Sequence, residues 1–294
     1  MTVTRFAPSP TGDLHLGGVW TALASSLLAR EHGGTMLLRV EDIDPPRVVA
    51  GSAERILEDL AWLGLAGDGA PVFQSARTAV YEEALRQLGA AGFTYPCDCS
   101  RAEIARIASA PHPGEETKDA IYPGTCRDAS RDREFKRAPS LRLRVPEGRK
   151  VVFRDAIHGV IEEDVAATTG DFVLQRADGV FSYQLVVAID DAAMGITDVV
   201  RADDLLGSTA RQVLLMELLG YATAPTYLHI PLVVAPDGAR LAKRTQGVTV
   251  RELRARGVAS TEIVATLAAA LFGRTARPLP PPRLWRREPW PVTL

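Results

Sequence analysis

Short apolar runs alternate with amphipathic segments along much of the chain. We expect buried strands at 3–7, 36–40, 72–74, 196–202 and 226–234, and helices at 19–28, 53–63, 81–88, 208–219, 249–255 and 260–272. Ser208 is the expected N-cap of its helix. Strands joined through helices share a sheet as parallel neighbours with right-handed crossovers. The alternation therefore predicts an α/β fold built on a parallel sheet.

A stretch near the middle interrupts this pattern. Residues 93–148 contain all three cysteines and several prolines. Two hairpins are expected next, at 151–164 and at 172–183. We therefore expect an insertion that splits the α/β domain, and a small helical appendix after its second half. The predicted divisions are 1–92, 93–180, 181–248 and 249–294.

The composition is that of an ordinary globular protein, with 46% hydrophobic and 24% charged residues. No apolar run reaches the ~20 residues that cross a bilayer, and the N-terminus lacks a secretory signal pattern. Three cysteines, an odd number, argue against a disulfide framework. We therefore expect a cytoplasmic monomer with no membrane partner. Residues 240–294 are strongly basic, which fits either a polyanion-binding surface or a solvated tail.

Two loops that follow the first two strands carry candidate ligand-binding groups. In open parallel sheets, ligands bind beyond the carboxyl ends of the strands. The first loop, PSPTGDLHLGG, is glycine-rich, and the helix after it offers free N–H groups to a phosphate; His15 could donate a further hydrogen bond. The second loop, EDIDP at 41–45, could neutralise a ligand ammonium or bind a metal. Each loop by itself could also be a plain turn.

The order of residues in the first loop resembles the signature of class I aminoacyl-tRNA synthetases, and RFAPSPTG resembles the glutamyl and glutaminyl branch. This resemblance implies a Rossmann-type sheet and an ATP site. The residues it assigns to ATP in this loop are Pro8, His15, Gly17 and Gly18, with His15 also catalytic. Gly18 stands where the usual signature has a second histidine, as is common in this branch.

The same resemblance implies a glutamate pocket. RVEDIDPPR is similar to the segment that binds the α-amino group of glutamate, a role carried to Glu41. Arginine binds carboxylates in a bidentate manner, which suits an anionic substrate. The remaining pocket residues that the resemblance implies are Arg5, Ala7, Ser9, Tyr183 and Arg201. Ala202 stands where the family usually has glycine.

A basic loop, GARLAKRT at 238–245, resembles the second signature of class I synthetases, Lys-Met-Ser-Lys-Ser. Arg240 replaces its first lysine and Ala242 its serine, while Lys243 is retained. Cations on such a loop suit the negative charge that develops as pyrophosphate departs from Mg-ATP. The resemblance therefore implies ATP binding by Arg240 and Lys243, and catalysis by Lys243.

Cys97, Cys99 and Cys126 would leave a tetrahedral zinc site one ligand short. From the residues alone, His112 is the fourth candidate. The segments CDC and IYPGTCR resemble the zinc module of the family, which implies one structural zinc with Tyr122 as the fourth ligand. Three thiols without a metal remain an alternative.

Little chain follows Lys243, and we expect no anticodon-binding domain. The resemblance then implies a short paralogue of glutamyl-tRNA synthetase. Such a paralogue activates L-glutamate with ATP without tRNA and esterifies it to the queuosine base in the anticodon loop of tRNA(Asp). Two alternatives stay open: a minimal glutamyl-tRNA synthetase that charges the acceptor end, and a non-catalytic RNA-binding relative.

Overall fold

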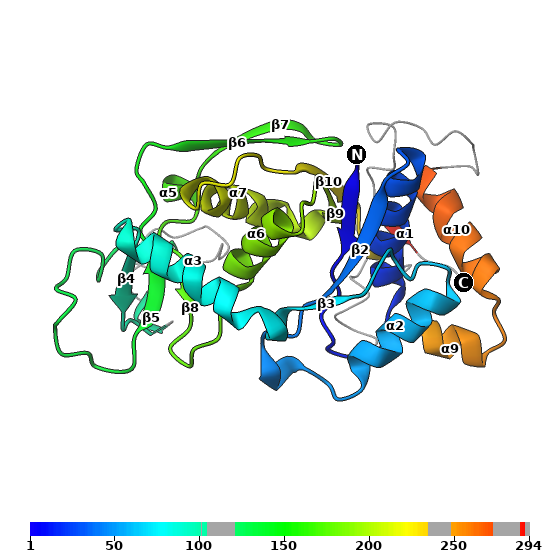
Figure 1. Ribbon diagram of the computed structural model, residues 1–294, viewed down its shortest axis with the longest axis horizontal. Helices are drawn as coiled ribbons and strands as arrows, with labels where there is room; N and C mark the ends of the chain where they lie inside the picture. The colour runs from blue at the N-terminus through cyan, green and yellow to red at the C-terminus, as the bar shows by residue number, and fades with distance from the viewer. Residues whose placement is uncertain (101, 105–120, 235–247, 273–288, 292–294) are drawn as a thin grey trace, which may run out of the picture.

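The first half of the central sheet has three parallel strands. The computed structural model describes residues 1–100, 102–104, 121–234, 248–272 and 289–291. The strands β1 (Val3–Phe6), β2 (Thr35–Val40) and β3 (Val72–Phe73) pair in that order. The helices α1 (Leu16–Glu31), α2 (Ser52–Trp62) and α3 (Thr78–Ala90) alternate with them (Figure 1). A short 3-10 helix, Pro45–Arg47, precedes α2, and another, Gln74–Arg77, precedes α3.

The second half places β9 (Asp198–Ala202) beside β1 and pairs it in parallel with β10 (Thr226–Ile230). The 3-10 helix Asp203–Ser208 leads from β9 into α7 (Thr209–Leu218). The predicted first hairpin is confirmed as β6 (Lys150–Asp155) and β7 (Gly159–Asp164), and β6 extends the sheet in parallel with β10. The predicted α/β class with a parallel sheet is thus confirmed.

A separate three-stranded antiparallel sheet lies at one end of the molecule (Figure 1). It contains β4 (Thr94–Cys97), β5 (Ser140–Leu143) and β8 (Val173–Gln175). The one-turn helix α5 (Val165–Thr168) precedes β8. Along the chain, β4 and β5 precede the β6–β7 hairpin, whereas α5 and β8 follow it.

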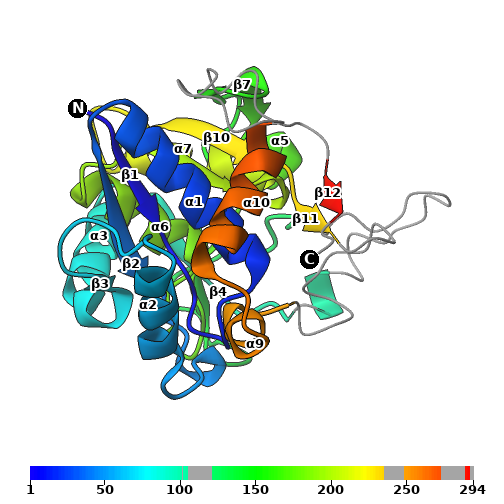
Figure 2. The same ribbon diagram turned by 90° about the vertical axis from the view of Figure 1, so that its right-hand side faces the viewer.

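The opposite end carries the helices α9 (Val250–Ala255) and α10 (Ser260–Phe272). A capping box between Thr249 and Glu252 starts α9, and α10 lies along α1 (Figure 2). The two-residue strands β11 (Val233–Val234) and β12 (Trp290–Pro291) pair in parallel.

Side-chain alternation along the strands divides the core into two layers. Val200 and Leu228 face the layer of α1, α2, α9 and α10, whereas their neighbours Val199 and Tyr227 face α3, α6 and α7. Both faces of the sheet are therefore covered, which explains its continuous apolar strands. No helix in the described ranges is long and apolar enough to span a membrane.

The structure departs from the expected elements between β8 and α7. The segment 172–183 was expected as a hairpin, and it does turn back at Asp178-Gly179, with an antiparallel bridge between Gln175 and Phe181. Arg176 N–H donates to Val180 O and Ser182 N–H donates to Leu174 O, each at 2.8 Å. The second arm is short, however, and no helix was expected directly after it. The helix α6 (Tyr183–Ala193) then begins, with the hydroxyl of Ser182 accepting from Leu185 N–H. Ser208 makes no capping hydrogen bond, because it lies in the helical turn that precedes α7.

Candidate functional site

A cavity of about 510 Å³ opens at the carboxyl ends of β1, β2 and β9. Six side chains expected around glutamate line it together with three residues expected around ATP: Arg5, Ala7, Ser9, Glu41, Tyr183, Arg201, His15, Gly17 and Gly18. Arg5 and Arg201, which are nearly 200 positions apart in the sequence, therefore line the same cavity. Pro8 lines a neighbouring cavity instead.

The signature loop leads directly into the N-terminus of α1. His15 is the N-cap residue, and its Nδ1 accepts a hydrogen bond from Gly18 N–H at 3.3 Å. An accepting Nδ1 places the proton on Nε2, so the ring retains a donor for a ligand. A larger residue at position 18 would crowd the Leu14 side chain, because a Cβ there would lie 2.7 Å from Leu14 Cδ1. The loop thus presents a helix N-terminus and an imidazole donor, which suit a phosphate.

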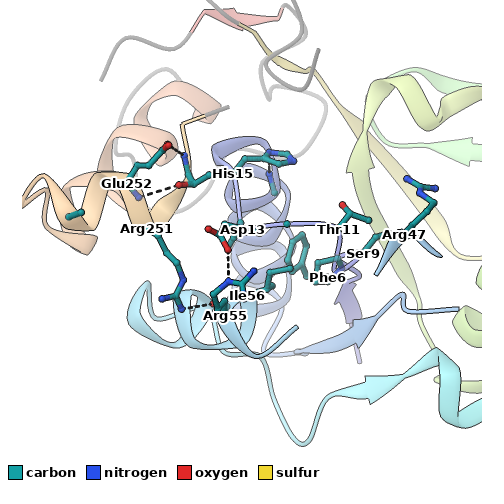
Figure 3. A pocket seen from close by; sticks show the side chains of 16 residues that line it. Phe6, Ser9, Thr11, Asp13, His15, Arg47, Arg55, Ile56, Arg251 and Glu252 are labelled. Carbon is teal, nitrogen blue, oxygen red and sulfur yellow. Dashed lines mark hydrogen bonds and ion pairs between the residues drawn. The ribbon is translucent and has the colours of Figure 1, made fainter. Parts of the chain in front are cut away.

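The far side of this loop borders a second cavity, of about 930 Å³ (Figure 3). Arg55 of α2 is paired with Asp13 at 2.6 Å, and Arg251 of α9 donates to Glu58 at 2.6 Å. These ion pairs join the loop to α2 and α2 to α9. They hold the base of the loop in place, and they leave these arginines engaged with protein carboxylates.

Arg201 at the end of β9 is buried and held at all three of its nitrogens. Nε donates to His229 Nε2 at 3.0 Å, and the other two nitrogens donate to Gln212 and Thr209 at 2.7 and 2.8 Å. Because Arg201 only donates, His229 must accept at Nε2 and donate from Nδ1 to Asp155, 2.7 Å away. Burial lowers the pKa of His229, which favours this neutral form. The guanidinium is therefore oriented before any ligand binds.

Glu41 follows β2 and also lines this cavity. Its backbone N–H donates to Pro8 O at 2.9 Å, which joins the two loops. Burial raises the pKa of Glu41, while the guanidinium groups of Arg39 and Arg5 act to lower it. Burial also raises the pKa of Tyr183, the first residue of α6, so its phenol stays protonated and can donate. The cavity therefore offers cations, an anion and neutral donors, which suits a zwitterionic ligand with an additional carboxylate.

The three cysteines form a compact cluster beside the antiparallel sheet. Their Sγ atoms all lie within 4.8 Å of one another. The Tyr122 hydroxyl lies 3.4 Å from Cys97 Sγ and 3.6 Å from Cys99 Sγ. Three sulfurs and one oxygen converging in this way fit a tetrahedral zinc ion. His112 lies outside the described residues.

Three residues of the expected basic loop fall outside the described ranges: Arg240, Ala242 and Lys243. Other residues that matter to the site were not predicted. Sequence reasoning missed Arg39, Asp191 and His229, which contact the predicted pocket residues. The available signal was a charged residue inside an apolar run, as in MLLRV and VVAIDD, because a buried charge requires a partner.

Comparison with known proteins agrees with this geometry. Residues 1–277 match the family model of the catalytic domain of class I tRNA synthetases (E and Q). The chain is 46% identical over 277 residues to a glutamyl-Q tRNA(Asp) synthetase of Nitratidesulfovibrio vulgaris, covering 90% of this chain and 84% of the relative. It is 52% identical over 250 residues to one from Burkholderia orbicola, covering 84% and 82%.

The structure also resembles that of a glutamate-tRNA synthetase from Elizabethkingia anophelis, with a TM-score of 0.70 and 32% identity. The match covers 87% of this chain and 54% of that chain, so this chain spans about half of that synthetase. The high identity to relatives over most of both lengths is the more specific finding. The chain therefore belongs to the class I glutamyl and glutaminyl tRNA synthetase family, and within it to the glutamyl-Q tRNA(Asp) synthetases.

Proposed function

We propose that this protein activates L-glutamate with ATP and transfers it to the queuosine base of tRNA(Asp). The observation that carries this function is the 46–52% identity to glutamyl-Q tRNA(Asp) synthetases over most of the chain. The cavity at the strand ends supports it, since it combines groups suited to phosphate with groups suited to an amino acid. The tRNA partner implies that the reaction takes place in the cytoplasm.

In this proposal different residues of the cavity bind the opposite charges of glutamate. Glu41 receives the α-ammonium, and Arg5 and Arg201 receive carboxylates, with Tyr183 donating a further hydrogen bond. Ala7 and Ser9 also line the cavity. The alternating charges match L-glutamate, and an arginine fork orients a carboxylate more strictly than a point charge does.

ATP lies over the N-terminus of α1 in this proposal, against His15, Gly17, Gly18 and the neighbouring Pro8. The glutamate α-carboxylate attacks the α-phosphorus, and pyrophosphate leaves as Lys243 and Arg240 neutralise its charge. A hydroxyl of the queuosine cyclopentenediol then attacks the acyl carbon, and AMP leaves. No protein nucleophile is required, because the rate comes from orientation and electrostatic stabilisation.

The acceptor can approach through a cavity of about 180 Å³ that adjoins the glutamate site. It shares Ser9, Glu41 and Tyr183 with the larger cavity. Single-stranded RNA loops present splayed bases that proteins recognise by shape and edge contacts. In this proposal the region of β4, β5 and β8 meets the anticodon arm.

We propose that one structural zinc ion is bound by Cys97, Cys99, Cys126 and Tyr122. The convergence of three thiols and a phenol supports this ligand set. Zinc would crosslink β4 to the segment around Tyr122, and it has no part in the reaction steps.

Glutamate-dependent ATP–pyrophosphate exchange in the absence of RNA tests the activation step. Exchange without RNA is expected, and its absence would refute the proposal. Exchange that requires tRNA(Glu) would instead favour a minimal synthetase. Labelled glutamate offered to tRNA(Asp) with and without queuosine tests the transfer, and equal labelling of both would rule out queuosine as the acceptor.

Replacing Lys243 by Ala should lower exchange by roughly 100- to 1,000-fold, since one preorganised charge that stabilises the transition state is lost. The fold should be unchanged by circular dichroism. Lys150→Ala is the matched control, because the side chain of Lys150 forms an exposed ion pair with Glu162 on the β6–β7 hairpin and lines none of the cavities described above. Exchange within threefold of the wild type in Lys243→Ala would contradict the proposed role.

A further inference from the structure

A fully buried arginine lies directly behind the glutamate cavity. Arg39 of β2 has no exposed side-chain surface, which is rare for arginine unless it is paired. One of its terminal nitrogens donates to Asp191 Oδ1 of α6 at 2.5 Å, and the other donates to Glu41 Oε1 at 3.2 Å. A single guanidinium therefore links α6 to the proposed ammonium-binding carboxylate.

The same Asp191 oxygen also holds Arg5. Arg5 Nε donates to Asp191 Oδ1 at 3.1 Å, and Arg5 Nη1 donates to Val200 O at 3.3 Å. Two of the three nitrogens are thus engaged on the protein side. The third, Nη2, makes no hydrogen bond to the residues that the structure describes, and Arg5 lines the cavity.

Strand geometry explains why these groups meet. Arg5 of β1 is opposite Leu37 of β2, so Arg5, Leu37 and Arg39 project from one face of the sheet. The helix α6 covers this face, and Asp191 on it is buried between the two arginines. Since Arg39 and Asp191 are 152 residues apart, only the assembled sheet brings them together.

We propose that Arg39 and Asp191 are positioning residues of the glutamate site: Asp191 orients Arg5 toward a substrate carboxylate, and Arg39 orients Glu41 and balances its charge. This inference rests on the proposed function. Neither residue lines the cavity, so neither touches the substrate. Asp191 acts through Arg5, and Arg39 acts through Glu41.

The charges around Glu41 make the inference testable by pH. The groups that face it or lie beside it are Arg39 on β2, Arg5 on β1, Asp190, Asp191 and Tyr183 on α6, Arg201 on β9, and Asp44 and Arg176 at the adjoining cavity. Burial raises the pKa of Glu41, Arg39 and Arg5 oppose this rise, and Asp191 adds to it. Only the ionised carboxylate attracts an ammonium, so glutamate affinity should fall as pH drops through this pKa.

The experiment measures L-glutamate binding by titration calorimetry between pH 5.5 and 8.5, with circular dichroism as the check on folding. Arg39→Gln removes the balancing cation, so the midpoint of the affinity profile should move up by about one pH unit or more. Well below the wild-type midpoint, affinity should then be at least about tenfold weaker than in the wild type. Asp191→Asn removes a like charge, so its midpoint should move down. Affinity at high pH should fall, because an amide oxygen holds Arg5 more weakly than a carboxylate oxygen does.

Arg39→Lys keeps the charge and is the variant least expected to unfold. A lysine cannot reach two carboxylates with one planar fork, so affinity should fall severalfold at every pH with the midpoint unchanged. Arg77→Gln is the matched control. This substitution breaks the 2.7 Å ion pair between Arg77 and Asp190, the neighbour of Asp191 on α6. Arg77 has no described contact with Glu41 or Asp191. Its binding profile should match the wild type.

The outcomes separate the inference from the function on which it rests. Wild-type protein that binds no L-glutamate at any pH would overturn both. Wild-type binding with unchanged affinity in Arg39→Lys, or with unmoved midpoints in Arg39→Gln and Asp191→Asn, would overturn the inference alone. A midpoint shift in Arg77→Gln equal to that of Arg39→Gln would also overturn it, because it would show a general loss of packing.

Discussion

Glutamate-dependent exchange should fall by roughly 30- to several-thousand-fold when Arg201 is replaced by Gln, mainly through a higher KM for glutamate. The removal of one partner from a buried, hydrogen-bonded charge pair costs about 2–5 kcal/mol, and each 1.4 kcal/mol is a factor of ten. Arg201 would form such a pair with the substrate carboxylate, because it is buried and its neutral partners His229, Gln212 and Thr209 hold it in place. Steady-state exchange kinetics at varied glutamate concentration provide the measurement.

A second variant at this position shows whether activity depends on the planar guanidinium of Arg201 or on its charge alone, and a variant at the surface is the control. Arg201→Lys keeps the charge but loses the planar donors, so an intermediate KM is expected. Arg149→Gln is the control, because Arg149 forms a surface ion pair with Glu217 and should leave KM unchanged. If Arg201→Gln folds and its glutamate KM stays within twofold of the wild type, Arg201 does not bind the substrate.

Replacing Cys97 by Ser should remove the bound zinc and lower the melting temperature of the region around the cysteines by at least about 5 °C. The hydrophobic cluster there has only four buried members among the described residues: Tyr95, Cys97, Tyr122 and Cys126. So small a core needs an additional crosslink to stay folded. Metal analysis and scanning calorimetry should show zinc loss and an earlier transition.

The matched control for this site is Tyr95→Phe. It removes a buried hydroxyl that donates to Asp171 but keeps all three thiols, so zinc content should stay at the wild-type level. Tyr122→Phe and His112→Ala then decide the fourth ligand. Weaker zinc binding in Tyr122→Phe alone supports the phenol, and weaker binding in His112→Ala alone supports the imidazole. Full zinc occupancy in Cys97→Ser would contradict the whole ligand set.

The helix α6 shows where sequence reasoning failed and why. Its residues Leu185–Ile189 are buried on every side, so no polar stripe marks a helical period. The hairpin expected at 172–183 forms its turn at Asp178-Gly179, but no helix was expected between this hairpin and the strand at 196–202. Tertiary burial therefore removed the periodic signal on which the prediction of a helix depends.

The sequence by itself determined the parallel α/β fold and the order of the motifs along it. It did so because each buried strand leads into a loop at the same edge of the sheet, and local composition defines both strand and loop. The glycine-rich loop before α1 and the carboxylate loop after β2 were recognisable for this reason.

Only the tertiary structure decided which charges balance one another. Arg39, Asp191 and His229 read as single polar residues in apolar segments, and nothing local shows their partners. A buried charge is stable only beside an opposite charge or a hydrogen-bonding group, and that partner comes from whichever element packs there. In this protein Arg39 links nearby Glu41 to Asp191, which lies 152 residues away from it, so the fold had to form before the orientation of the glutamate site was defined.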